Sequence, residues 1–121
     1  MRNNRGDAAL LWDMLSSAEA ILEMTVGMEF DGFCADRRTR RAVERELEII
    51  AEAARGISPE LKAAAGHIPW QKIIRQRHKI AHDYAELQEE ILWRVVRQHL
   101  PSLVEQLKAL IPDPPAADGD A

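Results

Sequence analysis

The chain has 121 residues, a net charge of −4 at pH 7 and a single cysteine, Cys34. This length suits one compact domain, and a lone cysteine excludes an internal disulfide. An acidic chain is unlike the strongly basic proteins that bind nucleic acid over a broad surface. Because we find no hydrophobic leader and no apolar run of about 18 residues, we expect a cytoplasmic protein without membrane contact.

Helices are the expected elements throughout the chain. Aliphatic residues and alanine are plentiful and aromatic residues are few, a composition that favours long helices over strands. The first predicted helix covers residues 8–29, since apolar residues recur there at spacings of three and four. This apolar stripe consists of Leu11, Leu15, Ala18, Leu22 and Thr25.

The next two helices are marked by their ends. The sequence GMEFDGFC at residues 27–34 predicts a turn, and Asp36 is placed to cap the helix that follows. That helix is predicted to end at Gly56. Ser58 and Pro59 then start a short helix that ends at Gly66. The apolar stripe of the long second helix consists of Val43, Leu47, Ile50, Ala54 and Ile57.

Two further helices complete the predicted domain. Pro69 starts the fourth principal helix, and the last helix runs from about residue 88 to 110, where Pro101 must kink or divide it. We therefore predict an all-α fold, an up-and-down bundle of four principal helices plus one short helix, in a single domain at residues 1–111. Residues 112–121 have too few apolar side chains to fold and are predicted to form a disordered tail. The inward stripe of the last helix consists of Leu92, Val96, Leu100, Leu103, Leu107 and Leu110.

Positive charge is concentrated in two places on this acidic chain. Five arginines lie within residues 37–45, where nearby glutamates favour a solvated helix face over a nucleic-acid or partner surface. The second place runs from Lys72 to His82 and overlaps the stretch RQRHKIAHDY at residues 75–84. The apolar period of the fourth helix passes through Arg77, and a guanidinium in a core is costly unless it is paired. Arg77 is therefore predicted at the edge of the core, in a cleft or at a subunit interface.

This stretch has the residue types for cleavage of RNA without a metal. His78 and His82 are neighbours on one helix face, and a second copy of the helix could bring two arginines and two histidines into one groove. A histidine can take the proton from a 2′-hydroxyl that attacks the adjoining phosphorus, and Arg77 can stabilise the charge that builds on the phosphate oxygens. The alternative is a helix end with ordinary solvated side chains. Zinc fits less well, because Lys79 stands where a zinc protease carries its catalytic glutamate, and we predict no metal and no cofactor.

The other residues with chemical potential are assigned to packing or to the surface. Cys34 lies in a predicted turn with no histidine near it in sequence, so a structural or solvent-exposed thiol is favoured over a nucleophile. His67 and His99 have the positions of loop and helix-face residues. Core or interface anchoring is the favoured interpretation of the three tryptophans, Trp12, Trp70 and Trp93.

Three stretches of the chain resemble the HepT-like branch of the HEPN superfamily. They are RRAVERELEIIAEAA (40–54), IPWQKIIRQRHKIAHDY (68–84) and EILWRVVRQHLPSLVEQL (90–107). The family motif is arginine, a polar residue, three further positions, histidine, any residue and tyrosine. Arg77, His78, residues 79–81, His82, Asp83 and Tyr84 fill it in order.

The resemblance implies a helical bundle that forms a homodimer with its motif helices together. It implies a metal-independent endoribonuclease toxin of a type VII toxin–antitoxin system, with Arg77 and His82 catalytic. His78 would be auxiliary, in the polar position that is often asparagine. The implied partner is a minimal nucleotidyltransferase antitoxin that attaches AMP to Tyr84, and a larger hetero-oligomer with this partner is left open.

The resemblance also gives a cause for the local positive charge, because one groove must attract RNA. Arg75 and Lys79 are the expected contacts to RNA phosphates. Two positions depart from the family pattern: alanine follows Tyr84, and Ala51 stands where glycine is frequent. Neither change removes the arginine and histidine pair. Two alternatives stay open, a noncatalytic helical module that docks a nucleotidyltransferase and a purely structural helical dimer.

Overall fold

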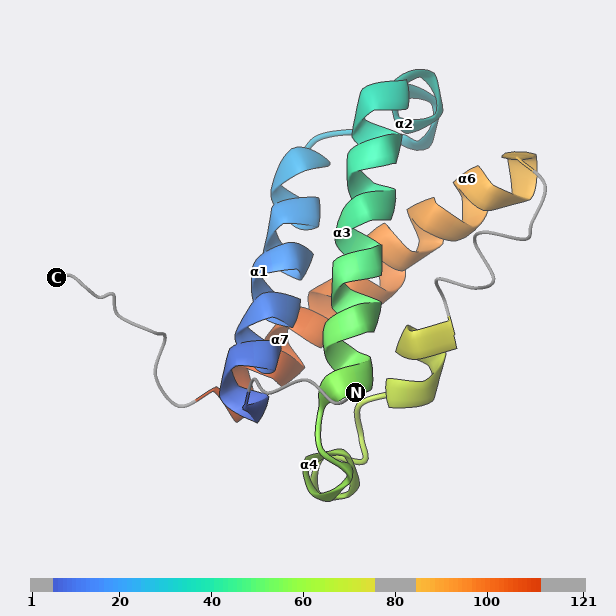
Figure 1. Ribbon diagram of the computed structural model, residues 1–121. Helices are drawn as coiled ribbons and strands as arrows, with labels where there is room; N and C mark the ends of the chain where they lie inside the picture. Colours follow the sequence, from blue (N-terminus) through green and yellow to red (C-terminus); the bar gives the residue numbers. More distant parts are fainter. Residues whose placement is uncertain (1–5, 76–84, 112–121) are drawn as a thin grey trace, which may run out of the picture.

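The computed structural model describes residues 6–75 and 85–111, with side chains for all of these except 85–87. Every regular element in this part of the chain is a helix (Figure 1), which confirms the predicted all-α fold class. None of the described helices is long and apolar enough to span a membrane. The elements in chain order are α1 (Asp7–Met24), α2 (Phe30–Ala35), α3 (Arg37–Gly56), α4 (Pro59–Ala64), a helix at residues 70–75, α6 (Ala85–Arg94), the π-helix η1 (Val95–His99) and α7 (Leu100–Leu110).

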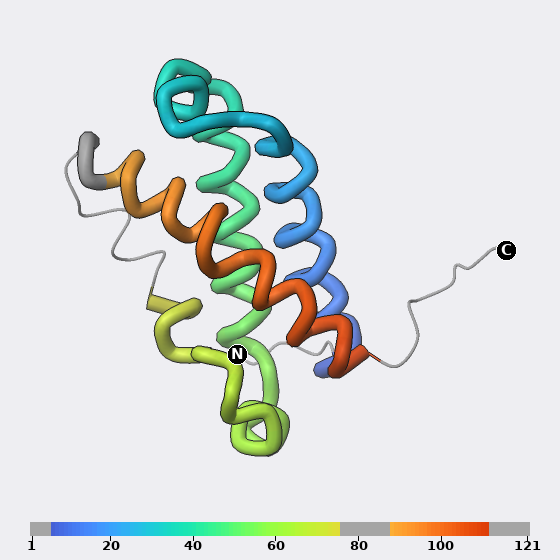
Figure 2. Tube along the Cα trace, turned by 180° about the vertical axis from the view of Figure 1, so that it is seen from behind, coloured from blue at the N-terminus to red at the C-terminus, as the bar shows by residue number. Residues whose placement is uncertain are grey.

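The helices form two layers. α1 and α3 lie side by side and antiparallel, and the continuous rod formed by α6, η1 and α7 crosses one face of this pair (Figures 1 and 2). α2 lies at the end of the bundle where α3 begins, and α4 lies at the end where α3 finishes (Figure 1). The helix at residues 70–75 follows α4 and lies beside the rod rather than within the α1–α3 layer (Figure 2). The rod therefore has one side against the core and one side toward the segment that carries Arg75.

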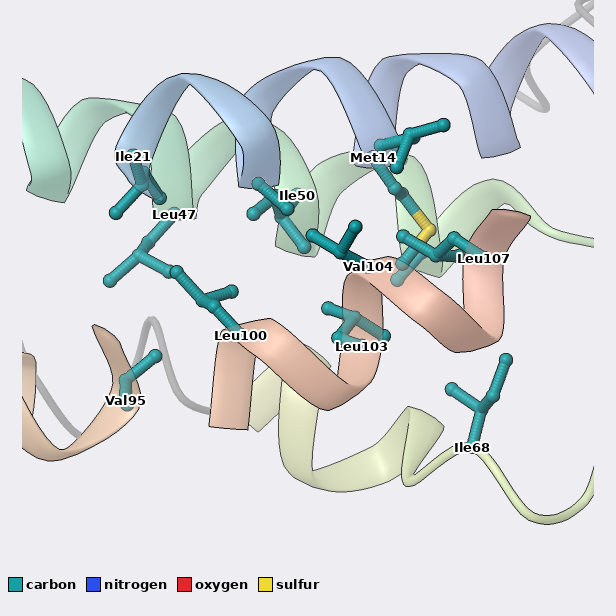
Figure 3. Close-up of a cluster of buried hydrophobic side chains, with 14 of the residues drawn as sticks. Met14, Ile21, Leu47, Ile50, Ile68, Val95, Leu100, Leu103, Val104 and Leu107 are labelled. Carbon is teal, nitrogen blue, oxygen red and sulfur yellow. The ribbon is translucent and has the colours of Figure 1, made fainter. Parts of the chain in front are cut away.

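The core lies between the two layers. Met14 of α1 points toward Val104 and Leu107 of α7, and Leu47 and Ile50 of α3 approach from the other helix of the pair (Figure 3). The apolar stripe predicted for the second long helix is confirmed, since all five of its members are buried. In the last helix all of the predicted inward residues are buried except one at its end, which is half-buried. Periodic apolar residues thus define the contact between the layers.

Polar caps fix the ends of α3 and α4 as predicted. The carboxylate of Asp36 accepts hydrogen bonds from the backbone N–H of Thr39 at 3.0 Å and from its hydroxyl at 2.8 Å. Both bonds lower the pKa of Asp36 because they favour the ionised carboxylate, and the bond from the backbone N–H has the larger effect. Ser58 Oγ accepts from the backbone N–H of Leu61 at 3.1 Å and donates to the carboxylate of Asp7 at 2.6 Å. The same serine therefore caps α4 and ties it to the start of α1.

The region between α1 and α3 differs from the prediction. The first helix was predicted to extend to residue 29, but α1 ends at Met24. The hydroxyl of Thr25 donates to the carbonyl of Ile21 at 2.8 Å, and Gly27 has a positive φ of 77°, which a helix does not tolerate. The segment predicted as a turn contains the short helix α2, which is held in place by the fully buried side chain of Phe33. Burial of one aromatic ring, which carries no periodic signal, stabilises this element.

The predicted interruption of the last helix at Pro101 takes the form of a π-turn. η1 ends two residues before this proline, and the backbone N–H of Leu100 donates to the carbonyl of Val95, five residues back. The buried residues Leu92, Val96 and Leu100 are spaced by four. At 3.6 residues per turn each step of four overshoots a full turn by about 40°, and the wider π-turn reduces this rotation between Val96 and Leu100. Buried side chains on both sides of η1 keep the rod in contact with α1 and α3.

Replacing Leu107 tests the contact between the layers. Leu107 is fully buried, and Leu107→Ala is expected to lower the free energy of unfolding by about 2–5 kcal/mol through lost transfer energy and a residual cavity. Urea unfolding measures this loss. Leu110→Ala, on the same helix but half-buried, is the matched control and is expected to lose much less. Equal losses in the two variants would contradict the packing described here.

Candidate functional site

The residues predicted for the site fall into two groups. The motif residues Arg77, His78, Lys79, His82 and Tyr84 lie outside the described residues. Arg75, the predicted phosphate contact that precedes them, is the last described residue of the helix that includes residues 70–75. The structure therefore places Arg75, and the geometry of the motif itself stays a prediction.

Arg75 lines a groove with a volume of about 820 Å³. One wall is the segment at residues 67–75, and the other is the rod formed by α6, η1 and α7. The floor is apolar and includes core residues from three elements, several of which appear in Figure 3. These floor residues are Leu47, Ile50, Ile73, Ile91, Val95, Leu100 and Leu103. The groove is thus a continuation of the apolar contact between the layers, open to solvent.

The rims of this groove carry positive charge. Lys72 and Arg75 come from one wall, Arg94 comes from the other, and all three are exposed. His67 and His99 also line it, and no carboxylate does so among the described lining residues. None of the three cations forms an ion pair within the described part of the chain. A chain with 20 acidic and 16 basic residues therefore has a hollow whose described walls are entirely neutral or basic.

Several side chains of the rod that line the groove lie in or beside the π-turn. Arg94, Gln98 and His99 line the groove, and they flank or belong to η1. Arg97 turns the other way: its guanidinium lies 4.5 Å from the ring centroid of Trp93 and donates to the carbonyl of Met28. π-Turns occur frequently at functional sites. Two arginines three residues apart in sequence thus have separate roles, one free at the groove and one engaged in packing.

Only part of this groove was predictable from the sequence. Lys72 and Arg75 belong to the basic stretch that was recognised, but Arg94 was not singled out, and His99 was expected to be an ordinary helix-face residue. The available signal was Pro101, which marks a local change of helical register and hence of the direction of nearby side chains. His67, expected in a loop, lies in the loop before Pro69 and lines the groove.

The arginines at residues 37–45 lie on a helix face rather than in a hollow. Arg37, Arg38, Arg41 and Arg45 are exposed, and Arg45 pairs with Glu48 at 3.3 Å. The fifth, Arg40, is partly buried and pairs with Glu89 of α6 at 3.5 Å, which joins the two layers. These observations agree with the solvated helix face that was favoured from the sequence.

Cys34 has the surroundings of an unreactive thiol. It lies in α2 and is partly buried. Burial raises the pKa of the Cys34 thiol, and the carboxylate of Glu89 raises it further as hydrogen-bond partner and as a like charge. A raised pKa leaves little thiolate at neutral pH, so a nucleophilic role is disfavoured.

The tryptophans lie where packing was predicted. Trp70 is buried and its Nε1 donates to the carbonyl of Ala65 at 3.1 Å. Trp93 is partly buried against Phe33, with ring centroids 5.0 Å apart, and Trp12 packs against the core. Among the described residues no group of three histidine, cysteine, aspartate or glutamate side chains could hold a metal ion.

Comparison with known proteins decides the family. Residues 14–110 match the family model described as Ribonuclease HepT-like. The chain belongs to the HepT-like ribonuclease family. This confirms the resemblance drawn from the sequence and the enzyme class expected from it, a ribonuclease.

Relatives of this HepT-like chain cover most of its length. It is 36% identical over 100 residues to "Probable ribonuclease HepT" of Thermococcus cleftensis, covering 83% of this chain and 91% of the relative. It is 32% identical over 105 residues to "Putative RNase MJ0127" of Methanocaldococcus jannaschii, covering 87% of each chain. No solved structure matches the chain significantly.

The raised pKa of Cys34 gives a test of its surroundings in this HepT-like chain. Because Glu89 raises this pKa, Glu89→Gln is expected to lower it and to speed alkylation of the thiol between pH 7 and 8, where the thiolate fraction limits the rate. Cys34 is the only cysteine of the chain, so alkylation with a maleimide reports on it alone. Glu90→Gln, an exposed neighbour, is the control. Identical rates in the two variants would contradict the assigned cause.

Proposed function

We propose that this chain is the metal-independent endoribonuclease toxin of a type VII toxin–antitoxin system, acting on RNA in the cytoplasm. Its ribonuclease class follows from the family. The observation that supports the proposal most is the groove, whose described walls carry Lys72, Arg75 and Arg94 without a carboxylate. RNA is a polyanion, and a basic hollow on an acidic protein attracts it locally. Arg75 precedes the first motif residue, Arg77, by two residues in the sequence.

In the proposed reaction the RNA supplies its own nucleophile. His82 takes the proton from a ribose 2′-hydroxyl, and the 2′-oxygen forms a bond to the adjoining phosphorus. The bond from phosphorus to the 5′-oxygen breaks, and this oxygen takes a proton from a protonated histidine, for which His78 is the auxiliary candidate. Arg77 binds the non-bridging oxygens and stabilises their developing charge. Because these steps use only imidazole and guanidinium groups, they require no metal ion.

The proposed assembly is a homodimer through the motif helices. A twofold axis would pool Arg77 and His82 of both protomers around one RNA linkage. Arg77 falls on the apolar stripe of the fourth helix, and a dimer groove at the edge of the core would let its charge meet phosphate there. Arg75 and Lys79 are the proposed contacts to flanking phosphates.

The proposed antitoxin is a minimal nucleotidyltransferase. The phenol oxygen of Tyr84 would attack the α-phosphorus of ATP, forming a tyrosyl–AMP bond and releasing pyrophosphate. Tyr84 is two residues from His82, so the added phosphate and adenosine would bring negative charge and bulk close to the proposed catalytic pair. Both effects oppose the entry of RNA.

Cleavage in the presence of a chelator tests the activity. Protein made without a nucleotidyltransferase is expected to cut RNA in EDTA, and Arg77→Ala and His82→Ala are expected to lower the rate about 100-fold or more, as removal of a proton-transfer or charge-stabilising group does. Arg55→Ala is the control, since Arg55 is exposed and pairs with Glu52 in α3. Intact RNA with the parent, or equal rates in all variants, would favour the noncatalytic binding module.

Intact-mass measurement tests the modification. Tyr84 is the only tyrosine of the chain, so after incubation with a minimal nucleotidyltransferase and ATP the parent should gain one AMP and Tyr84→Phe none. The modified parent is expected to lose RNA cleavage, because the phosphate repels the substrate. Tyr84→Phe should stay active under the same treatment. An AMP gain in Tyr84→Phe would place the modification elsewhere.

A further inference from the structure

We infer that the groove between residues 67–75 and the rod binds the RNA strand next to the cleaved linkage, with Lys72 and Arg75 on one rim and Arg94 and His99 on the other. This inference rests on the proposed function and extends it to residues that lie outside the motif. Arg94 and His99 are phosphate-binding and positioning residues in this account, and they take no part in the chemical step.

Unpaired charge is the first argument for this assignment. Lys72, Arg75 and Arg94 are exposed and form no ion pair within the described part of the chain. Glu90 precedes Arg94 by four residues, the spacing that favours a helical ion pair, yet the two do not pair. Three cations at one hollow repel one another, and a polyanion relieves that repulsion. The groove is therefore complementary to successive phosphates.

The shape of the groove is the second argument. Its volume of about 820 Å³ lies within the range of about 300–1,000 Å³ that is usual for organic ligands. The floor is apolar, with Ile73 and Ile91 partly buried, and the basic groups stand at the rims. An unstacked RNA base can lie on such a floor and against a guanidinium plane, and its phosphates can reach the rims.

A second copy of this chain fits the groove less well than RNA does. A twofold interface through this groove would bury the rim cations of both protomers together, and the described lining offers no opposite charge to pair with them. Charged residues are also depleted at the centres of stable interfaces. The described lining contains no carboxylate that could pair with Arg94 or Lys72 of a symmetry mate.

The exposed arginines of α3 are the competing basic surface. Arg37, Arg38 and Arg41 lie on a helix face that also carries Glu48 and Glu52 farther along. α3 contributes only the core side chains Leu47 and Ile50 to the groove, and its arginine face contributes none of the described lining residues. Arg41 has no ion pair within the described part of the chain. It is therefore a matched control for Arg94, with the same charge, similar exposure and a different location.

The salt dependence of RNA binding tests the inference. The probe is a fluorescein-labelled uridine dodecamer, and binding is followed by anisotropy between 50 and 300 mM KCl on a His82→Ala background, which prevents cleavage. Each lost phosphate contact is expected to reduce the slope of log K against log salt by about 0.7. The slope should therefore fall by about 0.7 in Arg94→Gln and by about twice that amount in the double variant Lys72→Gln, Arg94→Gln. An adenosine dodecamer should lose affinity by the same factor, since phosphate contacts are independent of sequence.

Arg41→Gln changes the net charge equally and is expected to leave the slope unchanged. Equal slopes in Arg94→Gln and Arg41→Gln would overturn the inference, because the effect would then reflect overall charge. The inference would also be overturned if the groove variants dissociated a dimer in analytical ultracentrifugation but kept the salt slope of RNA binding. The groove would then be an interface between copies. Thermal unfolding of each variant verifies folding.

The same experiment separates the inference from the proposed function. If the parent protein cleaves RNA but the salt slopes of the groove variants are unchanged, this inference is wrong and the ribonuclease proposal is unaffected. Binding that depends on Arg94, with no cleavage by the parent, would remove the proposed activity and retain the groove as an RNA-binding site.

Discussion

The contact between the rod and the α1–α3 pair is the constraint on which the rest of the structure depends. Leu92, Val96 and Leu100 must all face the core, although they are spaced by four and precede Pro101. A regular α-helix would rotate this stripe by about 40° at each step of four, and an interior proline removes one backbone hydrogen bond. The π-turn η1 lies just before this proline and reduces the rotation within a continuous rod. Hydrophobic burial on both sides of η1 is therefore maintained through an uncommon helical geometry.

That geometry has a consequence on the solvent side of the rod. The residues that keep the stripe in the core also set the directions of Arg94, Gln98 and His99, which line the groove, and of Arg97, which packs on Trp93. The groove floor consists partly of the same side chains that join the layers. The position of the basic rims is thus fixed by core packing and needs no salt bridge of its own. A site built on packed helices holds its charged groups more firmly than one built on loops.

Prediction from the sequence succeeded where a repeating physical signal exists. The stripe of α3, the Asp36 and Ser58 caps and the helix after Pro69 follow from period, capping chemistry and proline geometry, and all are present. The prediction failed at α2, because the burial of a single ring, that of Phe33, stabilises this helix. A single buried residue produces no repeating pattern in the sequence. For the candidate site, the basic stretch at Lys72 and Arg75 was visible in the sequence. The role of Arg94 could not be predicted in this way, since Arg94 reaches the groove only because the folded rod lies beside residues 67–75.

The distribution of charge follows from the same arrangement. A uniformly basic surface binds all nucleic acid with similar affinity. Here the net charge is −4, and the arginines of α3 are partly offset by glutamates on the same helix. Within the described part of the chain, Lys72, Arg75 and Arg94 remain without an ion pair at the groove. Screening at physiological ionic strength limits the field of exposed charges to about 8 Å, so these cations act locally and do not make the whole protein a polycation. Charge concentrated on a packed groove is therefore compatible with an acidic chain, and its location follows from the crossing of the rod over α3.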